Sequence, residues 1–202
     1  MEYQYIVIEG VIGVGKTTLA RMLTKRLNAQ LILEQHEKNP FLEDFYKNPR
    51  QYAFQTQLFF LLNRYRQQQS IPQRNLFHEM LISDYLFAKD KIFACLTLEA
   101  RELQLYEKIL PLLERDIPRP DLVVYLRSQP TRLIENIKLR NRNYEKNISY
   151  EYINALNSTY NEFFKHYQET PLLVIDATKL DFVKNKNDFK YIVNLILNNK
   201  LT

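Results

Sequence analysis

Glycine is scarce in this chain. Only 3 of its 202 residues are glycine, whereas average usage predicts about 14. All three lie between positions 10 and 15. A fold that does without glycine elsewhere and gathers it there needs unusual backbone freedom at that one place.

Cysteine is also scarce, and long apolar runs are absent. The single Cys95 cannot form an internal disulfide, and its apolar neighbours predict a buried, unreactive thiol. No apolar run approaches the roughly 20 residues of a membrane helix, and the strand-like start leaves no room for a signal peptide. We therefore expect a cytoplasmic protein with no membrane partner. An apolar content of 46% and a charged content of 25% indicate one globular domain over residues 1–202.

The glycines belong to a phosphate-binding motif. Residues 10–17 fit G-x-x-x-x-G-K-[ST] and follow the β-branched run 5–8. Such a loop turns successive N–H groups toward phosphate oxygens at the positive end of the next helix. Lys16 would reach the β- and γ-phosphates, and Thr17 would offer a hydroxyl to Mg²⁺. The alternative is a chance match in a strand–turn–helix connection. The predicted phosphate-binding residues are Gly10, Gly13, Val14, Gly15, Lys16, Thr17 and Thr18.

Unbroken apolar runs predict the remaining strands. Such runs are typical of parallel strands with both faces covered by helices. We therefore expect an α/β P-loop kinase fold, with a five-stranded parallel sheet flanked by helices and no internal repeat. The further strands are predicted at 30–33, 77–83, 122–126 and 172–175, and the helices at 16–28, 40–69 with a break at Pro49, 85–116 with breaks, 129–141, 149–169 from an N-cap at Ser149, and 187–199.

Two acidic residues follow predicted strands. Glu34 comes after the second strand and Asp84 after the third. Ligands of parallel α/β sheets collect beyond the carboxyl ends of the strands, where a carboxylate can hold Mg²⁺ or accept a proton from an attacking hydroxyl. The alternative is that each acid is a helix N-cap or a solvated turn residue.

A long helix and a basic turn could bind the rest of a nucleotide. Gln57 and Arg64 are seven residues apart, so two helical turns bring an amide and a guanidinium onto one face beside aromatic rings. Arg140 and Arg142 stand in the connection 138–146, where arginines can neutralise charge on a transferring phosphoryl group. The alternatives are an ordinary core helix with two surface polar groups, and a solvated loop or nucleic-acid contact. The histidines have no metal-ligand spacing.

Together these motifs resemble the deoxyribonucleoside kinase family over nearly the whole chain. The run IEGVIGVGKTT is similar to the family's P-loop, and Glu34 to its catalytic glutamate, the general base for the substrate 5′-hydroxyl. The resemblance also implies that Tyr46 binds the sugar 3′-hydroxyl, that Gln57 binds the base and that Arg64 lies on the base side.

The lid and the C-terminal region extend the resemblance. The segment 140–145 is similar to the family's lid, R-G-R-x-x-E. The resemblance implies that Arg140 and Arg142 grip ATP phosphates and that Glu145 touches the sugar. The sequence LLVIDATKLDF is similar to the segment around the ATP adenine, which places Asp181 and Phe182 there. The family is commonly dimeric through helices like 40–69 and 85–116, so a homodimer is expected.

Departures from the family pattern concern charge. No arginine follows Asp84, and Lys89 and Lys91 are candidate replacements. Asn136 stands where the family often has an arginine, and Asn141 where it has glycine. The base-pocket aspartate of the family could be Asp90, or could be absent.

The sequence therefore predicts transfer of the ATP γ-phosphoryl group to the 5′-hydroxyl of a deoxyribonucleoside, with Mg²⁺ between Thr17 and Asp84. A Gln–Arg pair on the base side resembles members that act on deoxyadenosine, deoxycytidine or deoxyguanosine rather than on thymidine. A thymidylate-kinase-type monophosphate kinase is the first alternative, and the missing arginine argues against it. A nucleic-acid-binding ATPase would account for the net charge of +5, but the C-terminal lysines alternate with acids, so no nucleic-acid partner is expected.

Overall fold

The sheet has five parallel strands. The computed structural model describes residues 3–71 and 80–199, and the strand order is β2-β3-β1-β4-β5. All neighbouring strands are parallel, which confirms the predicted architecture. The strands are β1 (Tyr5–Gly10), β2 (Gln30–Ile32), β3 (Leu81–Ser83), β4 (Leu122–Arg127) and β5 (Leu172–Asp176).

The helices occur where the sequence predicts them, with shorter bounds. Pro49 is the first residue of the helix that follows the predicted break. The described helices are α1 (Lys16–Leu27), α2 (Leu42–Lys47), α3 (Pro49–Gln69), α5 (Lys89–Thr97), α6 (Ala100–Glu114), α7 (Pro130–Arg140), α8 (Tyr150–Lys165) and α9 (Lys186–Asn198), with 3₁₀ turns η1 (His36–Lys38) and η2 (Asn143–Glu145).

Three differences from the predicted helices exceed one or two residues or divide a helix. Residues 85–88 are not helical, and α5 begins only at Lys89. A capping box between Glu99 and Glu102 starts α6 separately. The amphipathic helix predicted to reach 169 begins at its Ser149 cap and ends at Lys165. Positions 77–79 of the predicted third strand lie outside the described residues.

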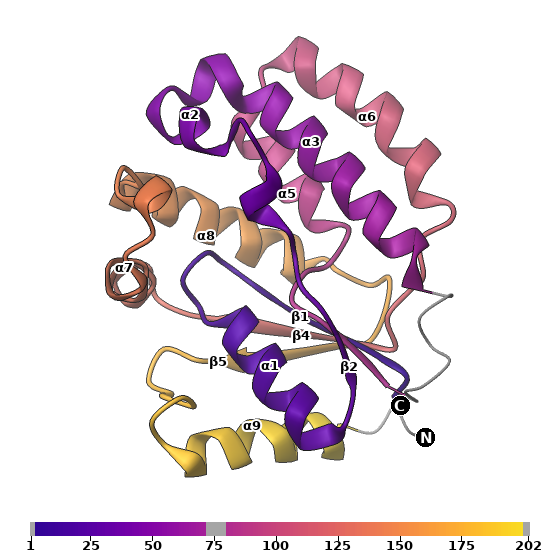
Figure 1. The fold of residues 1–202 in the computed structure, drawn as a ribbon, viewed down its shortest axis with the longest axis vertical. Helices are drawn as coiled ribbons and strands as arrows, with labels where there is room; N and C mark the ends of the chain where they lie inside the picture. Colours follow the sequence, from indigo (N-terminus) through magenta and orange to yellow (C-terminus); the bar gives the residue numbers. More distant parts are fainter. Residues whose placement is uncertain (1–2, 72–79, 200–202) are drawn as a thin grey trace.

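Helices cover both faces of the sheet. In Figure 1, α1 and α9 lie below the strands and α5 and α8 lie above them, with α3 and α6 stacked beyond α5. All residues of β1 and β3 are therefore buried. The edge strand β5 is an exception, because Val174 is 46% exposed. The prediction of two covered faces is wrong for β5.

The environment of Cys95 also differs from prediction. Cys95 is exposed, although its neighbours Ile92 and Ala94 are buried. Successive helical residues are turned by about 100°, so Cys95 lies on the outer side of α5. In residues 3–71 and 80–199, no helix is long and apolar enough to cross a membrane.

Candidate active site

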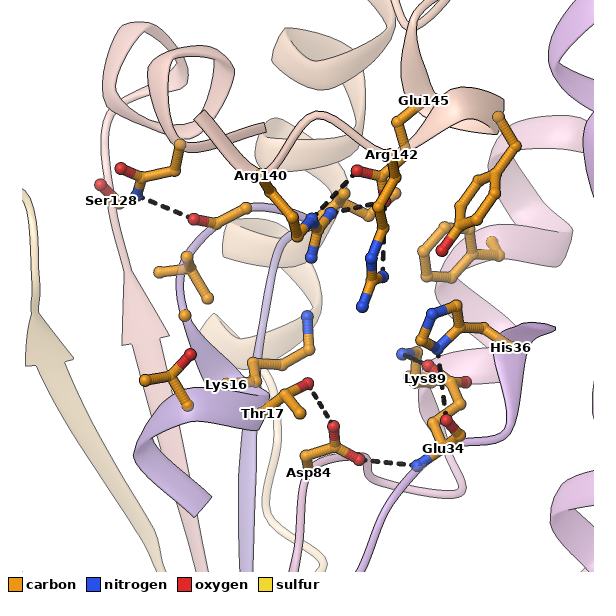
Figure 2. A pocket seen from close by; sticks show the side chains of 18 of the residues that line it. Lys16, Thr17, Glu34, His36, Asp84, Lys89, Ser128, Arg140, Arg142 and Glu145 are labelled. Atoms are coloured by element: carbon orange, nitrogen blue, oxygen red, sulfur yellow. Dashed lines mark hydrogen bonds and ion pairs between the residues drawn. The ribbon is translucent and has the colours of Figure 1, made fainter. Parts of the chain in front are cut away.

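A cavity of about 420 Å³ lies beyond the carboxyl ends of the strands. It is bounded by the loop after β1, by α2 and α3, by the α7–η2 connection and by the loop after β5 (Figure 2). Every residue predicted to bind ATP, Mg²⁺ or the nucleoside lines this cavity except Gly10, whose carbonyl accepts from Lys16. The further candidates Asp90 and Lys91 do not line it. The fold therefore gathers residues that are far apart in sequence.

The loop between β1 and α1 depends on glycine. Gly13 has φ of 89° and Gly15 has φ of 101°, which other residues rarely adopt. A Cβ atom on Gly13 would lie 2.6 Å from the Leu133 carbonyl oxygen of α7, and one on Gly15 would lie 2.8 Å from the Phe182 ring. The clustered glycines thus serve both the turn and close packing on two neighbours.

Lys16 extends from the start of α1 into the cavity (Figure 2). Its Nζ donates to the carbonyl oxygens of Gly10 at 2.6 Å and Val11 at 3.2 Å. Burial, together with repulsion from Lys89, lowers the pKa of Lys16 to about 8. The ammonium is held at the loop, where an anionic ligand would restore the charge balance.

Asp84 links the phosphate loop to the chain after β2. Its carboxylate accepts from the Thr17 hydroxyl and, at 2.7 Å, from the backbone N–H of Glu34. The strand register places these groups together, because β3 lies between β1 and β2. Thr17 and Asp84 are thus adjacent, as predicted.

The oxygens of Thr17 and Asp84 fit a magnesium ion. Mg²⁺ prefers hard oxygen ligands and usually combines one or two carboxylates with waters and substrate phosphates. In the described part of the chain, no group of three His, Cys, Asp or Glu residues could hold a metal by itself. The residues present therefore suit an ion that arrives with a nucleotide.

Glu34 lies opposite Lys16 in the cavity and is held by two cations. One oxygen accepts from the Arg64 guanidinium, with Nε at 2.7 Å, and the other accepts from Lys89 Nζ at 2.9 Å. Burial favours the neutral acid, but Arg64 and Lys89 outweigh it and hold the pKa of Glu34 below its ordinary value. The carboxylate is therefore ionised at neutral pH and fixed in position.

The α3 face brings Gln57 and Arg64 to the cavity wall. Both side chains are buried, and Arg64 also pairs with the fully buried Asp90 of α5. Phe60 lies between them, with the Arg64 guanidinium 4.9 Å from its ring centroid. A planar group entering here would meet aromatic and hydrogen-bonding surface together.

Aromatic residues close the side of the cavity near Tyr46. The Tyr46 and Tyr144 rings are stacked with centroids 6.5 Å apart, and Tyr152 meets Tyr46 edge-on at 6.4 Å. Burial raises the pKa of Tyr46 well above its ordinary value. Its phenol therefore stays protonated and can donate to a hydroxyl.

Arg140, the last residue of α7, and Arg142 converge on Glu145. Arg140 donates from Nε at 3.0 Å, and Arg142 lies 3.7 Å from the same buried carboxylate. In Figure 2 both guanidinium groups point into the cavity above Lys16. Asn141 between them has φ of 49°, so asparagine supplies the left-handed turn that glycine supplies in the family's lid.

The other departures from the family pattern also have structural explanations. Asn136 donates to the Gly13 carbonyl at 2.8 Å and so supports the phosphate loop. Lys89 lies in the cavity beside Glu34, but Lys91 pairs with Glu114 of α6 and does not line the cavity. Of these two lysines, Lys89 is therefore the one placed to replace the missing arginine.

Asp181 and Phe182 lie beside the phosphate loop. Both line the cavity, and Phe182 is buried against Gly15. The Asp181 carboxylate accepts from the backbone N–H of Lys184 at 3.0 Å and so closes a turn. Both residues therefore lie at the phosphate-loop end of the cavity.

Sequence reasoning missed several residues near the site, among them Glu9, His36 and the cavity-lining Arg132 of α7. Glu9 is fully buried and accepts from the backbone N–H groups of Gly10 at 2.8 Å and Leu86 at 2.7 Å. His36 lines the cavity and contacts the Glu34 carbonyl through Nδ1 at 3.2 Å. An acid inside an apolar strand was the available signal for Glu9, whereas nothing in the local pattern pointed to His36.

Comparison with known families matches residues 6–202 to the deoxynucleoside kinase model. The chain belongs to the deoxynucleoside kinase family. It is therefore an ATP-dependent phosphotransferase, and the monophosphate kinase and nucleic-acid ATPase alternatives are not favoured.

Individual members of the family match over most of their length. Deoxyguanosine kinase of Bacillus subtilis is 39% identical over 193 residues, covering 93% of each chain. Deoxyadenosine kinase of Dictyostelium discoideum is 39% identical over 168 residues, covering 82% of this chain and 68% of the relative. The structure of deoxyadenosine kinase from M. mycoides with the products dCMP and a flexible dCDP bound has a TM-score of 0.83 at 29% identity, and the match covers 96% of this chain and all of that one.

Proposed function

We propose that the chain transfers the γ-phosphoryl group of ATP to the 5′-hydroxyl of deoxyadenosine, deoxycytidine or deoxyguanosine, in preference to thymidine, and that residues 1–202 form one kinase domain. The observation that carries this proposal is the ionised Glu34, held by Arg64 and Lys89 in the same cavity as Lys16. Relatives named deoxyguanosine kinase and deoxyadenosine kinase support the choice of base.

In this proposal the phosphate loop holds ATP. The loop amides and Lys16 bind its phosphates, and the adenine lies against Phe182 beside Asp181. Thr17 and Asp84 would hold Mg²⁺, which when bound neutralises phosphate charge. The hydrogen bond from the Thr17 hydroxyl to the Asp84 carboxylate supports this assignment.

The nucleoside occupies the opposite end of the cavity. Tyr46 and Glu145 contact the sugar, while Gln57 and Arg64 lie at the base. Support comes from the position of Tyr46 among stacked rings, which leaves its protonated phenol facing the cavity. Glu34 then lies between the base side and the phosphate loop.

Proton transfer and charge compensation complete the reaction. The 5′-oxygen forms a bond to the γ-phosphorus, its proton passes to a Glu34 oxygen, and the bond to the β–γ bridging oxygen breaks with its electron pair left on ADP. Arg140 and Arg142 offset charge on the transferring group. Lys89 supplies further positive charge where the family's arginine is missing.

We also propose a cytoplasmic homodimer. Apolar side chains on the outer face of α3 and α6 support it, because Leu62 is 39%, Leu105 49% and Leu112 66% exposed. Contiguous exposed apolar surface marks interfaces, and Leu105 and Leu112 are seven residues apart on α6, which places them on one face of that helix. A single cysteine agrees with a reducing compartment.

The test is ADP release across deoxynucleosides, ribonucleosides and their monophosphates, with Glu34→Gln and Lys16→Ala as variants. Both variants should lose at least about a hundredfold in kcat with the preferred deoxynucleoside, while Glu34→Gln still binds ATP. Wild-type turnover by Glu34→Gln would remove Glu34 from proton transfer. Turnover confined to monophosphates would replace the proposed acceptor.

A further inference from the structure

Two polar side-chain pairs join α3 and α5 beside the base end of the cavity. The helices lie side by side. Arg64 of α3 pairs with Asp90 of α5, and Gln57 of α3 donates from Nε2 to the Thr97 hydroxyl at 3.3 Å. The two members on each helix are seven residues apart, so Gln57 and Arg64 of α3 are each anchored by a polar group of α5.

The hydroxyl of Thr97 fixes which end of the Gln57 amide it meets. Thr97 Oγ1 donates its one proton to the Phe93 carbonyl at 2.7 Å, one turn back along α5. It can therefore only accept from Gln57, and only the amide nitrogen can donate. The orientation of the amide thus follows from the hydrogen-bond network.

The other groups of the amide remain for a ligand. Gln57 is 2% exposed and lines the cavity, and within residues 3–71 and 80–199 no group donates to its Oε1. One N–H of Nε2 is used by Thr97. A ligand therefore meets one acceptor, Oε1, and one donor, the second N–H of Nε2. The hydrogen bond to Thr97 fixes where each of the two lies.

The relative positions of this acceptor and this donor matter for binding a purine base. Adenine presents a donor at position 6 beside a ring acceptor, whereas guanine presents an acceptor at position 6 beside a ring N–H. An amide matches both edges, but only in opposite orientations. Resting on the proposed function, we propose that Thr97 is a specificity-determining residue, which holds the Gln57 amide in one orientation and so discriminates 6-amino from 6-oxo purine deoxynucleosides.

The discrimination has a physical cause and a predicted limit. With Thr97 in place, the mismatched purine leaves two buried polar groups facing like groups, which a site built to hydrogen-bond its substrate rejects strongly. Without the Thr97 hydroxyl, the amide turns over to match either base. The ratio of kcat/KM values for deoxyadenosine and deoxyguanosine should then move toward one.

The experiment compares Thr97→Val, which keeps the shape and removes the hydroxyl, with Thr97→Ser, which keeps the hydroxyl. At saturating Mg·ATP we expect Thr97→Val to narrow the kcat/KM ratio of the two nucleosides about tenfold, and Thr97→Ser to stay within about threefold of wild type. The KM for ATP should not change in either variant, because Thr97 contacts α3 and not the phosphate loop.

Other outcomes overturn the inference. An unchanged ratio in Thr97→Val, an equal narrowing in both variants, or a wild-type chain that does not discriminate between the two purines would each remove Thr97 from this role. The proposed function fails separately, because a chain without deoxynucleoside-dependent ADP release would show no ratio at all.

Discussion

At the residue scale, the buried charges around Arg64 show the cost of placing ions inside the fold. Arg64 is buried and neutralised by two carboxylates, those of Glu34 and Asp90. Glu34 keeps a second partner in Lys89, whereas within the described chain Asp90 has only Arg64 as an ion-pair partner. Loss of Arg64 therefore leaves Asp90 as an unpaired buried anion, which is costly because protein interiors solvate charge poorly.

We expect Arg64→Met to lower the free energy of unfolding by about 3 kcal/mol. Adding Asp90→Asn to the same chain should recover part of this loss, because the unpaired carboxylate is then removed. Urea unfolding of both variants measures the effect. As the control, Lys91→Met breaks a half-exposed pair with Glu114 and should cost less than about 1 kcal/mol. Equal costs for Arg64→Met and Lys91→Met would contradict the argument.

At the element scale, Glu9 joins the end of β1 to the turn after β3. Its two short hydrogen bonds hold the first amide of the phosphate loop and the Leu86 amide, two residues beyond Asp84. A third contact, from the Tyr160 hydroxyl of α8, is longer at 3.4 Å. The carboxylate thus keeps the phosphate loop and the predicted metal ligand in register.

We expect Glu9→Gln to raise the KM for Mg·ATP about tenfold. The side-chain NH₂ of the glutamine would face one of the two backbone N–H groups that Glu9 binds, and that hydrogen bond would be lost. The KM for the nucleoside should change little, since the hydrogen-bond partners of Glu9 are Gly10, Leu86 and Tyr160 and include no residue of α3. Tyr160→Phe is the control, and it should keep the KM for Mg·ATP within about threefold of wild type. Initial rates measured at varied ATP and at varied nucleoside give the two KM values. An equal rise in both would contradict a role of Glu9 that is confined to the phosphate loop.

The elements also show how far sequence reasoning reaches. The phosphate loop and the strands are local patterns, so motif spacing and apolar runs predicted them, and the resemblance to the family identified the lid turn. The partners of Glu34 come from α3 and α5, and those of Glu9 from the turn after β3 and from α8. Contacts of this kind depend on how helices pack on the sheet, which no short-range pattern records. The exposed side of α5 at Cys95 was misjudged for the same reason.

At the scale of the whole molecule, tyrosine dominates the response to high pH. Burial raises the pKa of Tyr5 to about 12 and those of Tyr46 and Tyr160 well above the ordinary value of 10.0. These phenols are neutral in the fold, but in the unfolded chain they ionise at their ordinary pKa. Stability from their burial is therefore complete below about pH 10 and is lost as the pH rises toward the folded pKa values.

We expect alkaline unfolding in which a large part of the tyrosinate absorbance appears together with the loss of circular dichroism, above the ordinary tyrosine pKa of 10.0. Parallel titrations of absorbance and circular dichroism test this. Tyr5→Phe should move the unfolding midpoint to higher pH, because one proton-releasing group is removed. Complete tyrosine ionisation in a chain that keeps its circular dichroism would contradict the prediction.

The packing of the phosphate loop limits how this enzyme can change its donor. Gly13 abuts the lid helix α7 and Gly15 abuts Phe182, so neither glycine has room for even a methyl group. Adaptation of the site to another nucleoside triphosphate must therefore come from other lining residues, such as those at 180–183. Laboratory selection for new donors should leave Gly13 and Gly15 untouched.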